Sequence, residues 1–194
     1  MKSSSRRLVL SLAAAGLAAT ASMSLATAAS AQPIREGGVF EETQVFADFC
    51  DVSGLTVQAD STTESRFMFN PHGPDGLGYG LEHLRITNVY TNQANGNAVT
   101  EKVTTLFKDL RVTDNGDGTL TILVLATGNA VVSGPDGKAI ARNPGQVRFE
   151  VLIDNGGTPS DPSDDEFLEF LRDVKESTGR TDDFCEAVVP VLID

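Results

Sequence analysis

Three charged residues in alternating segments could carry acid–base chemistry. Glu82, Arg148 and Glu150 lie in runs where apolar and polar residues alternate, a pattern typical of half-buried β-strands. If their face of the strands lines a barrel interior, they form with Lys102 a polar pocket that holds an acid, a base and an anchor. If that face meets water, they are ordinary solubilising residues. The sequence favours the second interpretation and leaves the first open.

Other catalytic or metal chemistry has few candidates. The chain has two histidines, His72 in a turn-like cluster and His83 in a strand, and it lacks the GxSxG element of serine hydrolases. Two histidines and two cysteines without CxxC spacing do not make a transition-metal site. The acidic turn 114–118 resembles part of an EF-hand loop but lacks the carboxylates of its first and last positions. We expect no cofactor or metal, and calcium binding by the acidic stretch 154–166 stays open.

The two cysteines predict one disulfide. Cys50 and Cys185 each follow an Asp-Phe pair and lie near opposite ends of the chain that follows residue 31. An even cysteine count in an exported protein is typical of a structural bond rather than a redox pair.

The first 31 residues have the pattern of a signal peptide. Three basic residues and no acidic one precede an apolar run over residues 8–25, which ends in Ala29-Ser30-Ala31. We expect cleavage before Gln32, secretion, and no stable membrane insertion afterwards. The triplet 5–7 partly matches a twin-arginine signal, so both the Sec and the twin-arginine routes remain possible.

The charge balance disfavours nucleic acids and anionic membrane surfaces as partners. The full chain has a net charge of −12, and the part after residue 31 keeps 12 basic against 27 acidic residues, a net of −15. Nucleic acids and anionic membranes are recognised by clustered Lys and Arg, so we expect neither as a partner. An extracellular small molecule or protein remains as the unknown partner.

The chain after the signal predicts a flexible leader over residues 32–42 and a single β-rich domain over 43–194. Clusters rich in Gly, Pro, Asn and Asp separate the β-type runs, with Asn143-Pro144-Gly145 as the last of them. About eight strands with short connections predict an all-β, mainly antiparallel fold. An up-and-down β-barrel is the first choice and a sandwich the second.

Two segments favour helices. The apolar residues of 164–175 recur at helical spacing, which we interpret as a helix in preference to a final strand. Residues 182–192 predict a short C-terminal helix around Cys185, broken by Pro190.

Several turn motifs resemble those of small secreted actinobacterial proteins that have no assigned activity. They comprise Thr113–Leu120, Ala126–Asn129, Gly134–Lys138, Gly157–Pro159 and the terminal Gly179–Cys185. The resemblance implies export, a β-rich domain and one disulfide, and it assigns no functional residue. Eight-stranded dirigent and allene oxide cyclase barrels are comparable in architecture only.

No catalytic constellation stands out, so the sequence favours a non-enzymatic extracellular module that binds a small molecule or another protein. The alternative is a small β-barrel enzyme of cyclase or isomerase type, with Glu82, Arg148 and Glu150 in a polar lumen.

Overall fold

The computed structural model describes residues 32–71 and 76–194. The predicted signal peptide and His72 lie outside these ranges. The described chain consists of seven strands, two short 3₁₀ turns and one helix: β1 (Ile34–Phe46), η1 (Phe49–Asp51), β2 (Val57–Pro71), β3 (Gly78–Asn92), β4 (Ala98–Asp114), β5 (Thr119–Ser133), β6 (Ala139–Asp154), η2 (Pro162–Asp164), β7 (Glu166–Lys175) and α1 (Phe184–Ile193).

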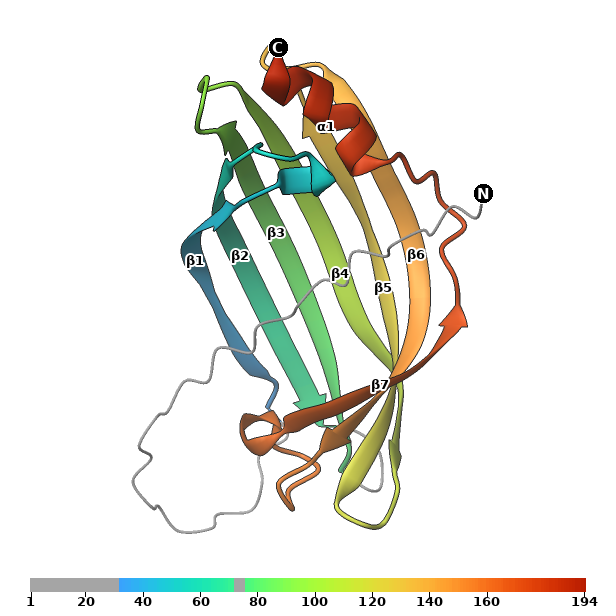
Figure 1. The fold of residues 1–194 in the computed structure, drawn as a ribbon. Helices are drawn as coiled ribbons and strands as arrows, with labels where there is room; N and C mark the ends of the chain where they lie inside the picture. The colour runs from blue at the N-terminus through green and yellow to red at the C-terminus, as the bar shows by residue number, and fades with distance from the viewer. Residues whose placement is uncertain (1–31, 72–75) are drawn as a thin grey trace. The chain divides into compact units, whose positions relative to one another are not determined.

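The strands form one antiparallel sheet in sequence order, β1 to β7 (Figure 1). Short hairpins join most of them, as the turn clusters predict. In the β4–β5 hairpin, Gly116 and Gly118 take φ values of 77° and 89°, a backbone region that favours glycine. The Asp114 carboxylate accepts a hydrogen bond from the Gly116 amide at 2.8 Å, which holds this turn closed.

The all-β antiparallel prediction is confirmed, but the sheet is not a closed barrel of eight strands. In the part of the chain that the structure describes, β1 pairs with β2 alone and β7 with β6 alone. These strands are therefore two free edges of a single open sheet. A second sheet, as a sandwich requires, is not present among the described strands.

The segment predicted as a flexible leader is mostly strand. Residues from Ile34 onward pair with β2 in an unbroken register from Ile34–Phe69 to Phe46–Val57. In the sequence, Gly37 and Gly38 favour a flexible segment. In the structure a side chain at Gly37 would meet the Ser65 carbonyl oxygen, so glycine here permits close strand approach.

The predicted helix over 164–175 is wrong, because residues 166–175 form β7. Three register shifts interrupt its pairing with β6, so that Phe167, Phe170 and Asp173 lie opposite Ile153, Val151 and Phe149. Three residues of β7 therefore span the same length of the sheet as two residues of β6. Bulges have converted the two-residue period of a strand into a three-residue period that imitates a helix.

The C-terminal helix is confirmed as α1, which begins after an Asp183 side chain that accepts a hydrogen bond from the Glu186 amide at 2.9 Å. It continues through Pro190 instead of breaking there. The predicted turn at 143–145 is instead part of β6. Pro144 is tolerated because β7 pairs with β6 only from Arg148 onward, so this part of β6 needs no amide donor on that side.

The helix α1 covers one face of the sheet at its end, and we call this side the helix face (Figure 1). The cluster there contains Val57 of β2, Val99 of β4, and Val188 and Leu192 of α1, all essentially inaccessible to water. Asn92 and Asn95 each donate a side-chain hydrogen bond of 2.9 Å to the Leu192 carbonyl oxygen. The opposite side of the sheet is called the outer face.

The disulfide is confirmed between Cys50 and Cys185, which are 135 residues apart. It joins the β1–β2 connection to α1. Aromatic rings pack beside it, and the ring centroids of Phe49 and Phe184 are 6.2 Å apart. No helix in the described ranges combines the length and apolarity that crossing a bilayer requires.

We predict that replacing both cysteines by serine destabilises the protein by up to about 4 to 5 kcal/mol, because the unfolded chain regains the entropy of a long loop. Guanidinium unfolding of the two forms measures the difference. Thiol titration of the denatured, unreduced protein should find no free thiol, and a titratable pair would contradict the bond.

Candidate anion-binding surface

The pairing register separates the three predicted site residues. Glu82 lies opposite Phe107, and its cross-strand row continues through Ala126 to Val147. Val147 precedes Arg148, and neighbouring residues of a strand point to opposite faces. Glu82 therefore lies on the helix face, whereas Arg148 and Glu150 lie on the outer face. The structure does not bring the three together in one pocket.

Glu82 has a local partner on the helix face. The Ser65 hydroxyl of the neighbouring strand donates a hydrogen bond of 2.8 Å to its carboxylate. Neither Arg148 nor Glu150 can reach this position through the sheet.

Glu150 forms a charged cluster on the outer face. The Arg172 Nε and Arg111 Nη2 atoms lie 2.7 Å and 3.0 Å from its two carboxylate oxygens. The Glu150 side chain is 8% exposed, while both arginines are mostly exposed. The hydrogen bond from Arg172 lowers the pKa of the Glu150 carboxyl, against a smaller opposing effect of burial. This cluster links β4 and β7 to β6.

The outer face also collects most basic side chains. Ten of the 12 Lys and Arg residues beyond residue 31 occupy outer-face positions in the pairing register. Eight of them lie in four adjacent cross-strand rows, which we call the basic band: Arg35, Arg66, Arg85, Lys102, Lys108, Arg142, Arg148 and Lys175. The same rows contain two acidic residues, Glu41 and Glu64. This surface is therefore positive in a chain of strongly negative net charge.

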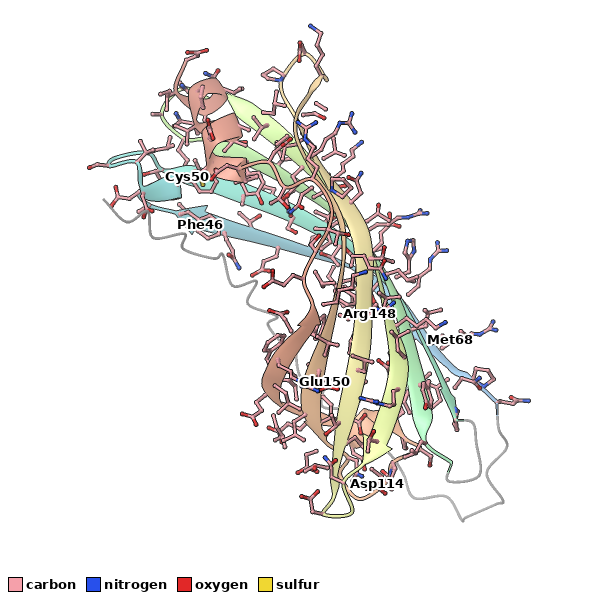
Figure 2. The ribbon with its side chains drawn as sticks, turned by 90° about the vertical axis from the view of Figure 1, so that its right-hand side faces the viewer. Phe46, Cys50, Met68, Asp114, Arg148 and Glu150 are labelled. Carbon is pink, nitrogen blue, oxygen red and sulfur yellow. A yellow bond between two sulfur atoms is a disulfide. The ribbon has the colours of Figure 1, made fainter. Side chains whose placement is uncertain are left out.

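No residue of the basic band forms an ion pair within the described residues, although Glu64 lies opposite Arg85 in the pairing register. The ion pairs among the described residues involve four other basic side chains, Arg111, Lys138, Arg172 and Arg180. The Arg148 Nε atom is buried and has no hydrogen-bond acceptor in the described structure. Figure 2 labels Arg148 and Met68 on this face, where many side-chain nitrogens point away from α1.

A shallow depression of about 370 Å³ adjoins the band near β1, β2 and β3. Its lining includes the basic side chains of Arg35 and Arg66 and the imidazole of His83. One carboxylate, that of Glu36, also lines it, and the apolar surface comes from Phe67, Met68 and Leu81. Cations beside a shallow apolar floor suit an extended anionic ligand better than an enclosed small molecule.

The helix face carries acidic groups at the end opposite α1. The Asp109 carboxylate accepts a hydrogen bond from the Gly80 amide at 2.6 Å. Burial raises the pKa of Asp109 to about 6 despite this bond. Burial and then neighbouring carboxylates, first Asp164 and then Asp161, raise the pKa of Asp165 to about 6 as well.

Carboxylates of the acidic stretch 154–166 are engaged within their own loop. Asp154 and Asp161 each accept a hydrogen bond of 3.0 Å from a backbone amide two residues later. Such local bonds stabilise turns in any acidic loop. The described residues contain no group of three or more His, Cys, Asp or Glu side chains placed to hold a metal ion.

No protein-family model, curated protein or solved structure matches the chain. The resemblance to small secreted actinobacterial proteins therefore stays a prediction, apart from the disulfide and the β-rich fold.

Sequence reasoning did not identify the basic band, although its signal is present. Arg85, Lys102, Lys108 and Arg148 each occupy the polar positions of an alternating strand, and only the register shows that these positions share one face. The net charge does not indicate this basic surface, because the acidic residues of the turns and loops outnumber the basic residues of the band.

We predict that Glu150→Gln lowers the thermal midpoint at pH 7. Because folding lowers the pKa of Glu150, its stabilising effect is complete above the ordinary carboxyl pKa and is lost as pH falls through the lowered value. In thermal melts, the difference between the two proteins should shrink as the pH is lowered below the ordinary carboxyl pKa. Glu64→Gln, an exposed outer-face control, should have little effect, and an equal loss in both variants would contradict the cluster.

We predict that the Asp109 carboxylate destabilises the folded protein at neutral pH, whereas the Glu150 carboxylate stabilises it. Its folded pKa is raised, so the wild type loses stability as pH rises from about 4 to 7 and the buried carboxylate ionises. Asp109→Asn should therefore be more stable than wild type at pH 7, by on the order of 1 to 3 kcal/mol. Urea unfolding at pH 4 and pH 7 measures this, and a difference of the same size at both pH values would count against it.

Proposed function

We propose that this chain is a secreted, non-enzymatic binding module that captures an acidic polysaccharide on the basic band. The observation that carries the proposal is the gathering of eight basic side chains, without ion-pair partners in the described residues, on one solvent-facing side of the sheet. The guanidinium group of arginine suits carboxylates in particular, because it can donate two parallel hydrogen bonds to one carboxylate.

The uncharged residues of the band favour a sugar polymer over a nucleic acid. Thr104, Thr127, Asn129 and Gln146 lie between the basic side chains in the same rows and can exchange hydrogen bonds with sugar hydroxyls. Single-stranded nucleic acids are held by stacking on several aromatic rings, and the four rows of the band contain none apart from the imidazole of His83.

Export is part of the proposal. The signal-like residues 1–31 and the Cys50–Cys185 disulfide both suit an oxidising compartment outside the cytoplasm. The alternative of a barrel enzyme requires Glu82, Arg148 and Glu150 to converge, and no observation favours it because the register sets Glu82 on the other face.

We predict that the protein from residue 32 binds polygalacturonate, a carboxylated polysaccharide, with an affinity that falls steeply as salt rises. In Arg66→Gln combined with Arg85→Gln, the affinity should fall by about tenfold, since two of the band's charges are lost. Isothermal titration calorimetry at two salt concentrations measures both effects.

The matched control combines Lys138→Gln with Arg180→Gln. These two basic residues lie outside the strands and already pair with Asp136 and Asp182, at 2.9 Å and 2.7 Å. The control removes the same charge and should bind like the wild type. Equal loss in both double variants would show general electrostatics without a site. Tighter binding of a single-stranded DNA oligonucleotide than of polygalacturonate would overturn the assignment of the ligand class.

A further inference from the structure

The edge strand β7 leaves much apolar surface uncovered. All ten of its residues are exposed, and among the described strands it pairs with β6 alone. Its apolar side chains have exposed fractions of 40 to 59%: Phe167, Leu168, Phe170, Leu171 and Val174. A free edge with apolar side chains is a ready template for another strand.

The charges of β7 are antisymmetric along the strand. Its outer-face positions, opposite Asp154, Leu152, Glu150 and Arg148 of β6, are Glu166, Glu169, Arg172 and Lys175. Two acidic residues are followed by two basic ones, at the three-residue spacing that the bulges create. A two-fold axis perpendicular to the sheet, between Glu169 and Arg172, reverses this order in a neighbouring copy and keeps every side chain on its own face. Asp173 is the one charged residue of the strand outside this pattern.

We propose that β7 pairs antiparallel with β7 of a second copy of this chain. Glu169 then lies opposite the partner's Arg172, Glu166 opposite the partner's Lys175, and Phe170 opposite the partner's Leu171. Opposite-charge and apolar pairs across neighbouring strands are favourable, and the edge backbone groups gain hydrogen-bond partners.

The other free edge does not suit the same role. β1 exposes Val39 and Phe40 by 64% and 54%, so it too has apolar surface. Its charges are Arg35 against Glu36, Glu41 and Glu42. A second copy of β1 would bring like charges together, and β1 lacks the order of signs that makes β7 complementary to itself.

Pairing along a single strand buries little surface compared with permanent dimers. We therefore expect a reversible dimer with a dissociation constant on the order of micromolar. Lys175 belongs to both the basic band and the proposed dimer contact. The two proposals are still tested separately, because the oligomeric state is measured without any ligand.

The test uses two variants that each spoil the charge pattern, Glu166→Lys and Lys175→Glu. Each variant alone sets like charges opposite one another and should weaken the dimer by about tenfold or more. Mixed together, they restore both ion pairs, so they should form a heterodimer as strong as the wild-type dimer. Sedimentation velocity over a range of concentrations measures self-association, and native mass spectrometry with one variant isotopically labelled identifies the heterodimer.

Glu42→Lys is the matched control, because it makes the same charge change at an exposed position of β1, on the other edge of the sheet, and should dimerise like the wild type. Far-UV circular dichroism establishes that all variants are folded. A wild type that stays monomeric at every concentration overturns the proposal. So do single variants that dimerise as well as the wild type, and so does a mixture of monomeric variants that forms no heterodimer.

Discussion

The packing of α1 against one end of the sheet decides which side of every strand is inside. Val188 and Leu192 of the helix are fully buried against Val57 and Val99 of the sheet, and the disulfide holds the helix in place. Once two strands bury their apolar residues on this side, the alternation of side chains along each regular stretch sets the face of the neighbouring strands. The basic residues are on the outer face for that reason, because the intervening positions of the same strands point away from the helix.

The sequence predicted those features that depend on local patterns. Most of the turn clusters, the alternating strand that contains Arg148 and Glu150, the disulfide and the C-terminal helix follow from spacing and residue type, and the structure contains them. Prediction failed where one local sequence pattern is compatible with two different structures. The bulges of β7 give an apolar spacing that a helix also gives, and glycine at position 37 serves a close strand contact as well as a flexible leader.

Long-range features could not be predicted in the same way. Whether a row of strands closes depends on curvature and on contacts between β1 and β7, which no local pattern encodes. The face of Glu82 depends on the registers of four strands counted one after another, and a single bulge would change the count. Net charge likewise describes the sum over a chain, whereas a partner meets one surface. The basic band is thus compatible with a protein that is acidic as a whole.

The position of the disulfide also determines what a cut in the chain would do. Every strand except β1 lies between Cys50 and Cys185, together with the hairpins that join them. Exposed hairpin tips are the preferred sites of proteolytic nicking. A protease that cuts once between the cysteines therefore leaves two pieces that are still one covalent molecule, with neighbouring strands still paired. The bond therefore keeps the two pieces of the sheet together after the backbone has been cut.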